Sequence, residues 1–268
     1  MSFVCFSFDV EEWDSPSVFG VESPHSLSTR FSAEGCRALL GLFGKFNVKT
    51  TFFVTGVFAR NHPDIVREMV TRGHEVACHG NVHRDLSKLS YDELKVDISV
   101  ALASVEAAAG VKIRGFRSPR NMVNPQLYRV LSELGLDYDS SVHPAILPGH
   151  LLGFLGRGDV HLVGGVVEVP MSTLFGLPIS WWWMRNIGVW YTRLGCEWGL
   201  RLHKYALLYS HPWEFTTLPE VKGLPKHMTS GTGDKALAGL ERMLVSFKER
   251  GCSFATVSEI ASSLSSRH

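Results

Sequence analysis

Two histidines four residues apart, His79 and His83, stand in a polar turn directly after the short apolar segment 74–78. On a helical turn or in a tight loop this spacing places both imidazoles on one side, where they can share a metal ion. Strand ends are also where α/β proteins build their sites, because the loops there can change without disturbing the sheet. Surface or capping histidines give the same spacing, and the chain has 12 His. The residues at the other strand ends decide between the two interpretations.

Ionisable residues follow most of the other segments that we predict to be strands. In chain order they are Asp9, Glu11, Glu12, Arg117, Asp139 and His211. If the strands run parallel, their carboxyl ends meet at one edge of the sheet and bring these side chains together. Two imidazoles and a carboxylate can hold a divalent ion and leave one position for water, while a second carboxylate and a third histidine can act as base and acid. This set predicts a metal-dependent hydrolase.

The elements that must position these residues alternate between strand and helix patterns. Strands are predicted over residues 5–8, 49–54, 74–78, 112–116, 137–141, 166–169, 205–209 and 253–257. Helices are predicted over residues 31–46, 63–72, 90–110, 125–134 and 235–250, with a last one from residue 258. This alternation predicts a parallel α/β sheet or barrel in a single domain over residues 1–268.

The stretch 145–204 fits this alternation least well, and we treat it as an insertion in the domain. It is rich in Gly and Leu and contains Trp181-Trp182-Trp183, Trp190 and Trp198. Aromatic clusters of this kind stack on sugar rings, settle at a membrane interface or belong to the core. We interpret these tryptophans as core or partial core.

Composition narrows the classes of function. With 268 residues, of which 45% are hydrophobic, the chain can bury a large core. The formal net charge of +1, from 27 basic and 26 acidic residues that are well mixed, argues against nucleic acid as a partner. The five cysteines are scattered and form no Cys-x-x-Cys pair, which favours a reduced protein without a disulfide framework.

The first residues and the hydropathy bear on location. Residues 1–8 lack a basic region and run into acidic residues from Asp9 onward, so they do not read as a signal peptide. No apolar run reaches transmembrane length. We therefore expect a cytoplasmic protein, acting at the inner membrane face where its substrate is lipid-linked.

Five short motifs, in order, resemble those of the polysaccharide deacetylase family, also called the NodB-homology domain or carbohydrate esterase family 4. Segment 7–12 (Ser-Phe-Asp-Val-Glu-Glu) stands where the family has Thr-Phe-Asp-Asp-Gly, and segment 79–83 matches its His-Ser/Thr-x-x-His motif. Segments 116–119, 139–141 and 207–214 resemble the third, fourth and fifth motifs. With Glu-Val-Pro-Met-Ser-Thr at 168–173, they are most similar to the subgroup found with exopolysaccharide and surface-glycan gene clusters.

The resemblance covers nearly the whole chain and implies both a fold and residue roles. The fold would be a distorted (β/α) barrel with about seven strands. Asp9 would be the catalytic base, oriented and kept charged by Arg117. His211 would be the general acid, with Asp139 setting its tautomer and charge. Two metal ligands would be His79 and His83, with Zn²⁺ as the expected ion.

The first motif departs from the family at the third metal ligand. Val10 stands where the family has its second aspartate, which is usually the carboxylate ligand. Glu11 is the best substitute and Glu12 the reserve. Gly80 also replaces the hydroxyl residue that follows the first ligand histidine. The expected metal set is therefore Glu11, His79 and His83.

The resemblance implies removal of an N-linked acyl group, an acetyl group above all, from an amino sugar. The sugar would belong to a surface polysaccharide, an O-antigen or a lipid-linked precursor, with peripheral membrane contact. One alternative is hydrolysis of another non-peptide C–N bond, as in the metal-free cyclic amide hydrolases that share this fold. The other is a catalytically inactive glycan-binding relative. The two histidines argue against the first, and Asp9, Arg117 and His211 argue against the second.

Overall fold

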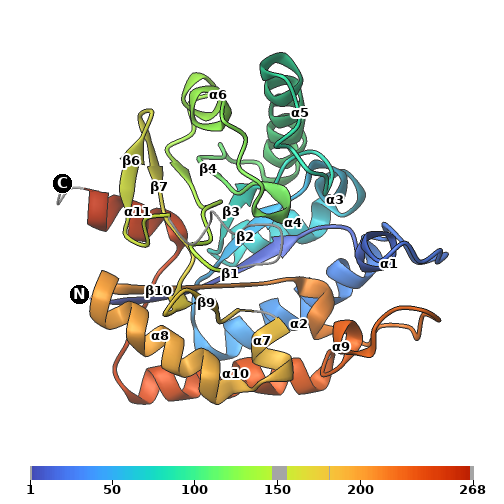
Figure 1. The fold of residues 1–268 in the computed structure, drawn as a ribbon, viewed down its shortest axis with the longest axis vertical. Coiled ribbons are helices and arrows are strands. Elements are labelled where there is room, and N and C mark those ends of the chain that lie inside the picture. The colour runs from blue at the N-terminus through green and yellow to red at the C-terminus, as the bar shows by residue number, and fades with distance from the viewer. Residues whose placement is uncertain (1, 147–155, 181, 266–268) are drawn as a thin grey trace.

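The computed structural model describes residues 2–146, 156–180 and 182–265, and its centre is a mostly parallel sheet with strand order β10-β1-β2-β3-β4-β5-β7-β6 (Figure 1). A further strand, β11, pairs with β1, and only β6 with β7 is antiparallel in this sheet. The strands are β1 (Phe3–Val10), β2 (Thr51–Val54), β3 (Glu75–Cys78), β4 (Gly115–Phe116), β5 (Tyr138–Asp139), β6 (His161–Val163), β7 (Val166–Glu168), β10 (Tyr205–Ser210) and β11 (Ser253–Phe254).

The segment 169–172, which follows β7, bridges the segment after β5 to β10. The backbone N–H of Met171 donates to Val142 O at 2.9 Å, on the β5 side. On the β10 side, the N–H of Ser172 donates to Leu207 O at 3.0 Å, and its Oγ accepts from the N–H of Leu207 at 2.9 Å. These bonds satisfy backbone groups that would otherwise form open sheet edges. The distorted α/β barrel implied by the motifs is confirmed.

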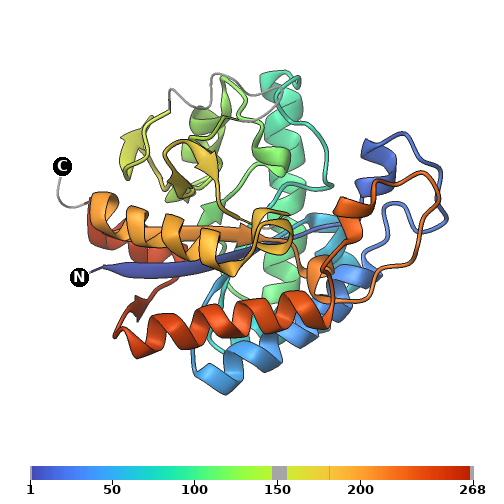
Figure 2. The same ribbon diagram turned by 60° about the horizontal axis from the view of Figure 1, so that its bottom comes forward.

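Helices cover the sheet on its outer faces. In Figures 1 and 2, α2, α8 and α10 lie along one side of the β1–β10 pair, and α5 and α6 stand on the other. The principal helices are α2 (Arg30–Phe46), α3 (Gly56–Asn61), α4 (Pro63–Thr71), α5 (Tyr91–Ala109), α6 (Leu127–Glu133), α8 (Val189–His203), α10 (Asp234–Glu249) and α11 (Val257–Ser265). The shorter ones are α1 (Ser15–Val18), η1 (Pro119–Asn121), α7 (Trp182–Asn186), η3 (Pro212–Phe215) and α9 (Lys226–Thr229).

The register of the parallel strands fixes which side chains face the barrel interior. One row of register partners crosses the sheet at Val10, Val54, Cys78, Phe116, Asp139 and Glu168. The four apolar members of this row belong to the core beneath the helices. Because side chains alternate along a strand, the preceding position on β1, Asp9, points to the barrel interior. The residues that follow the row leave the sheet together at its carboxyl edge.

The predicted Trp-rich insertion contains the hairpin of β8 (Thr173–Leu174) and β9 (Leu177–Pro178), followed by α7 and α8. Trp183 and Trp198 are half-buried and pack against the core, as predicted. Trp190 is 62% exposed, so the core interpretation is wrong for this residue. Residues 147–155 and Trp181 lie outside the described residues. Within the described ranges, no helix combines the length and the apolar character needed to span a bilayer.

Candidate active site and metal centre

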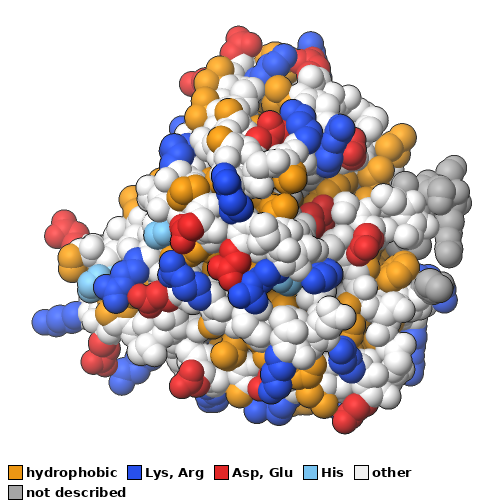
Figure 3. Space-filling view, turned by 180° about the vertical axis from the view of Figure 1, so that it is seen from behind, with side chains coloured by type: hydrophobic (Ala, Val, Ile, Leu, Met, Phe, Trp, Pro, Cys, Tyr) orange, Lys and Arg blue, Asp and Glu red, His pale blue; other side chains and the backbone are white. Residues whose placement is uncertain are grey.

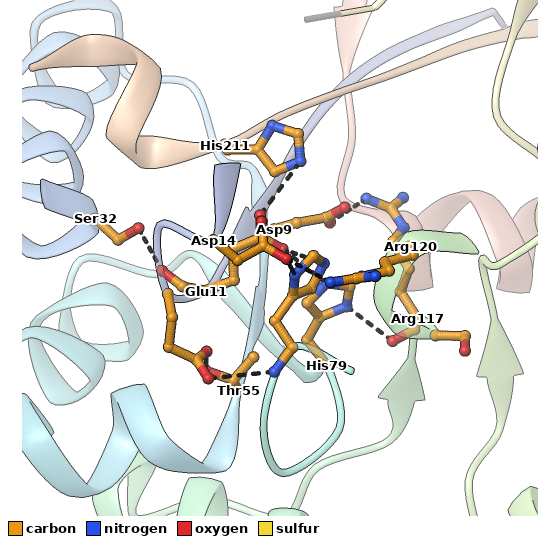
Figure 4. Close-up of polar contacts among 12 residues, drawn as sticks. Asp9, Glu11, Asp14, Ser32, Thr55, His79, Arg117, Arg120 and His211 are labelled. Carbon is orange, nitrogen blue, oxygen red and sulfur yellow. Dashed lines mark hydrogen bonds and ion pairs between the residues drawn. The ribbon is translucent and has the colours of Figure 1, made fainter. Parts of the chain in front are cut away.

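Glu11, His79 and His83 converge at the carboxyl edge of the sheet, and their ligand atoms all lie within 4.8 Å of one another (Figure 4). Glu11 Oε2 is 2.9 Å from His83 Nε2 and 3.4 Å from His79 Nε2. Glu11 Oε2 and His79 Nε2 are buried, and because their close contacts within the cluster lack hydrogen-bond geometry, neither atom makes a hydrogen bond within the described residues. Buried polar atoms left unsatisfied in this way are costly. A divalent cation between the three side chains would satisfy both, so these residues fit a metal ion.

In both histidines, the ring nitrogen that faces away from the cluster contacts an oxygen atom, which fixes the orientation of the imidazole. His79 Nδ1 lies 2.9 Å from the carbonyl oxygen of Arg117, and His83 Nδ1 lies 2.8 Å from Asp14 Oδ2. Since a carbonyl oxygen can only accept, Nδ1 of His79 donates, which leaves Nε2 as the ligand atom. Partners of this kind fix the ring and tautomer of metal-binding histidines. Asp14, which we did not predict as a site residue, therefore belongs to the site.

The charges in this cluster are strongly coupled. Burial raises the pKa of Glu11, but the facing His83 and His211 outweigh it and hold that pKa well below its ordinary value. Burial lowers the pKa of His83, but Glu11 and Asp14 outweigh it and raise that pKa to about 10. Without a metal, His83 thus carries a proton between two carboxylates. Metal ligands must be deprotonated, so a cation bound here would release that proton.

The structure separates the two glutamates of the first motif. Glu12 turns away from the cluster: its Oε1 accepts from the backbone N–H of His83 at 3.2 Å and its Oε2 accepts from Thr55 Oγ1 at 3.2 Å. Val10 is fully buried in the helix-side core, where its side chain cannot reach the cluster. The register thus explains why the carboxylate near the histidines comes one residue later, at Glu11.

The backbone conformation explains why glycine stands at position 80, the other departure from the family motif. Its φ is +73°, a region that residues with a Cβ rarely adopt. A Cβ there would also lie 3.1 Å from Pro119 Cγ. Glycine is therefore required by the local backbone, and its presence does not indicate a degenerate site.

Asp9 is held by a fully buried arginine. Arg117 Nη1 donates to Asp9 Oδ1 at 2.7 Å and to Ser7 Oγ at 2.9 Å. Its Nε donates to Ser140 O at 2.9 Å, and its guanidinium stacks on Phe53 at 4.0 Å. These contacts leave the guanidinium one position, so Asp9 is fixed at the cavity wall.

His211 follows β10 and faces the cluster, with its Nε2 3.6 Å from Glu11 Oε1 (Figure 4). Its Nδ1 lies 3.1 Å from Glu214 Oε1, and Arg185 Nε donates to Glu214 Oε2 at 2.6 Å. Burial lowers the pKa of His211, but Glu11 and Glu214 outweigh it and raise that pKa above its ordinary value. The indole of Trp213 stacks on the imidazole, with ring centres 5.0 Å apart.

Asp139 does not take the place that we expected for it. It lies in the same register row as Phe116, so its side chain faces the helices and not the barrel interior. Its Oδ1 accepts from Ser141 Oγ at 2.7 Å, and Glu168 on the neighbouring strand is its register partner. The carboxylate beside His211 Nδ1 is that of Glu214. The His-x-x-Glu spacing in the turn after β10 was the signal that could have indicated this pair.

These groups surround a cavity of about 250 Å³. Its lining includes Asp9, Glu11, His83, His211 and Trp213. The candidates for base and acid and the three candidate metal ligands therefore surround one small cavity at the carboxyl edge of the α/β barrel.

Residues 28–138 match the family model for polysaccharide deacetylase, a range that includes His79, His83 and Arg117. The chain is 29% identical over 132 residues to a bifunctional xylanase/deacetylase of Pseudobutyrivibrio xylanivorans, covering 47% of this chain and 22% of that protein. It is 30% identical over 111 residues to a chitooligosaccharide deacetylase of Bradyrhizobium, covering 41% and 49%. The chain thus spans less than half the length of these curated relatives.

The fold extends the likeness over the whole chain. The crystal structure of a proposed polysaccharide deacetylase from Mycobacterium smegmatis superposes with a TM-score of 0.70 at 23% identity, covering 97% of this chain and 89% of that one. The polysaccharide deacetylase model thus matches the segment that carries the His79/His83 and Arg117 motifs, as predicted, and the rest of the chain shares the fold of the Mycobacterium smegmatis protein. The closer likeness to the exopolysaccharide-associated subgroup stays a prediction.

Proposed function

We propose that this protein is a metal-dependent hydrolase that removes an acetyl group from the nitrogen of an amino sugar. The observation that carries the proposal is the cluster of Glu11, His79 and His83, whose buried and unsatisfied atoms face one another beside Asp9 and His211. A metal, a carboxylate and a histidine around one cavity suit the hydrolysis of an amide bond.

When bound, a divalent ion would supply Lewis-acid chemistry, polarising the acyl carbonyl and making a water more acidic. Asp9, fixed by Arg117, is the carboxylate placed to take a proton from an attacking water in the cavity. His211, whose pKa is raised by the facing carboxylates, is placed to donate a proton from Nε2 to the departing amine. Glu214 holds the imidazole at Nδ1, so Nε2 faces the cavity.

The geometry of the site argues against both alternatives, the metal-free cyclic amide hydrolase and the inactive glycan-binding relative. In a metal-free cyclic amide hydrolase, no ion would satisfy the buried atoms Glu11 Oε2 and His79 Nε2. An inactive glycan-binding relative would not require the buried Arg117–Asp9 pair or the Arg185–Glu214–His211 chain. Buried pairs of this kind are expensive to desolvate and are weak contributors to stability.

We further propose that the substrate is a cell-surface glycan or its lipid-linked precursor, handled in the cytoplasm at the membrane face. The outer side of α8 supports membrane contact, because it exposes Trp190, Leu194 and Leu202 together with Arg193 and Arg201. Aromatic and aliphatic side chains flanked by cations are typical of helices that lie on anionic bilayers. Zn²⁺ is the proposed ion, given two imidazoles and one carboxylate.

The test is acetate release from a panel of N-acetylated oligosaccharides by the purified protein, before and after chelation and again after Zn²⁺ is restored. Release that chelation abolishes and Zn²⁺ restores is expected. Turnover that persists in protein shown to be metal-free would favour the cyclic amide alternative. Stoichiometric metal without turnover on any acylated sugar, with glycan binding retained, would favour the inactive relative.

A further inference from the structure

The loop that follows Arg117 presents two side chains to the catalytic cavity that the proposed chemistry does not use. Arg120 and Asn121, in η1, line the same cavity as Asp9 and His211. Neither contacts the metal cluster directly. Their position raises the question of which part of a substrate they meet.

The backbone at these two residues is unusual. Arg120 has a φ of 58° and Asn121 a φ of 54°, so two successive residues with side chains lie in the left-handed region. This region is uncommon for asparagine and rarer still for arginine. Ser118 braces the loop, since its N–H donates to Ser141 Oγ at 2.8 Å and its Oγ donates to Met122 O at 2.7 Å. Backbone held in this way is concentrated at ligand-binding sites.

The guanidinium of Arg120 is only partly engaged. Nη2 donates to Asp14 Oδ2 at 2.8 Å, and the side chain is 42% exposed (Figure 4). Among the described residues that line the cavity, Arg120 is the only Lys or Arg. A guanidinium carries five N–H donors in a planar fork that matches a carboxylate or a phosphate. The donors that Asp14 does not use are available to a ligand in the cavity.

Asn121 beside it supplies an independent sign of a polar ligand. Its Oδ1 is buried and makes no hydrogen bond within the described part of the chain. An acceptor left in this state is costly unless a donor arrives. A hydroxyl or an amide N–H of a bound sugar is such a donor, and it would sit next to the group that Arg120 contacts.

We infer that Arg120 is a specificity residue that recognises a negative charge on the substrate, so that the preferred amino sugar carries a carboxylate or a phosphate near its acylated nitrogen. The inference rests on the proposed function for the identity of the sugar, while the recognition itself is a matter of binding. Arg120 contacts the substrate and takes no part in proton transfer. A neutral sugar makes no ion pair with it.

The experiment compares binding of three probes to the Zn²⁺-loaded protein by calorimetry: N-acetylglucosamine, N-acetylglucosamine 1-phosphate and N-acetylglucosaminuronic acid. The variants are Arg120→Gln and the control Arg114→Gln. Arg114 is exposed and lies directly before β4, at the end of the strand away from the cavity. The parent and the control should bind at least one anionic probe 10-fold or more tightly than the neutral sugar. Arg120→Gln should lose that preference and keep its affinity for the neutral sugar. The tighter of the two anions identifies phosphate or carboxylate.

Three results would overturn the inference: equal affinity of the parent for all three probes, an equal loss for all three in Arg120→Gln, or loss of bound zinc in that variant. The last two would make Arg120 a support for Asp14 and His83 only. Failure of the proposed function is distinguishable. An anion preference that depends on Arg120, in a protein that deacetylates no sugar, would sustain the subsite and refute the hydrolase.

Discussion

Each reactive side chain of the site is paired with a buried group that fixes its position and charge. Arg117 holds Asp9, Asp14 holds His83, and Glu214 holds His211. For His83 and His211, the facing carboxylates outweigh burial and raise the pKa of the imidazole. The roles of these residues can therefore be separated by removing one partner at a time.

Replacing Asp9 by asparagine should abolish hydrolysis while metal stays bound, because an amide cannot take a proton from water. General bases contribute about 10²- to 10⁴-fold, so the loss should be plain in an ordinary assay. The measurements are acetate release and zinc content. Loss of zinc in Asp9→Asn would make Asp9 a ligand instead of the base.

Removing the carboxylate of Glu11 should weaken metal binding by about 10-fold or more, since one of three protein ligands is lost. Glu12→Ala should have a much smaller effect, because Glu12 bonds to Thr55 and to the backbone of His83. Competition with a chelator of known affinity measures both variants. An equal effect at the two positions would contradict the assignment.

Glu214→Gln should shift the alkaline limb of the pH–rate profile to lower pH. Glu214 helps to raise the pKa of His211, so removing its charge makes the imidazole lose its proton earlier as pH rises. An opposite charge at this distance is worth about 1 pH unit or more. Asp139→Asn is the control and should leave the limb in place. A limb that moved with Asp139 and not with Glu214 would restore the original expectation.

At the scale of elements, the helices and strand ends were predictable where their patterns were strong. The predicted helix 31–46 differs from α2 by one residue, and the capping box at Ser90 and Glu93 is present. The hydrophobic periodicity did not predict α8. This helix packs one side on β10 and exposes large apolar residues such as Trp190 on the other, so its apolar residues are not confined to one face. Arg185 was missed for a similar reason, since it lies on the short α7 in the same stretch.

Asp139 shows why a motif in the right order can still mislead about a contact. Its place at a strand end was predicted correctly, but the face of a side chain depends on register. Tyr138 points into the barrel interior, and Asp139 therefore points to the helices. There it forms a buried pair of acids with Glu168 across β5 and β7. Asp139 thus contacts its neighbour in the sheet, whereas the carboxylate beside His211 is that of Glu214, from the same turn as His211.

This buried pair predicts a pH-dependent stability. Burial, with Asp139 adding to it, raises the pKa of Glu168 well above its ordinary value. A raised folded-state pKa gives stability that is full below the unfolded value of about 4.3 and is lost as pH rises toward the folded value. Glu168→Gln keeps a donor without titrating, so it should flatten the decline in stability as pH rises above the unfolded value. Urea unfolding at several pH values, with the exposed Glu220→Gln as control, measures this. A parallel decline in parent and Glu168→Gln would refute it.

At the scale of the whole molecule, charge is mixed over the face seen in Figure 3, where cationic and anionic side chains alternate without a large patch of either sign. This face reflects the near balance of 27 basic and 26 acidic residues in the chain. The outer side of α8 differs, because Trp190, Leu194 and Leu202 are 62%, 47% and 54% exposed. Exposed tryptophan beside leucine is uncommon on a surface that meets only water.

The membrane proposal is tested with the double variant Trp190→Ser/Leu194→Ser. The parent should co-sediment with vesicles that contain phosphatidylglycerol, and less with neutral phosphatidylcholine, because each arginine near an anionic surface adds about 1 kcal/mol. Burying a large apolar side chain is worth about 1.5–3 kcal/mol, so the double variant should lower partitioning by roughly 10-fold or more.

The matched control, Val96→Ser/Val100→Ser, removes exposed apolar surface from α5 and should change nothing, since those valines are 63% and 44% exposed on a different helix. Sedimentation velocity without lipid tests whether this face of α8 instead forms a contact between two copies of the chain. A concentration-dependent dimer in the parent that the α8 variant abolishes would assign this face to a second copy of the chain. Partitioning that the α8 substitutions leave unchanged, or that the α5 substitutions reduce equally, would remove α8 as the membrane contact.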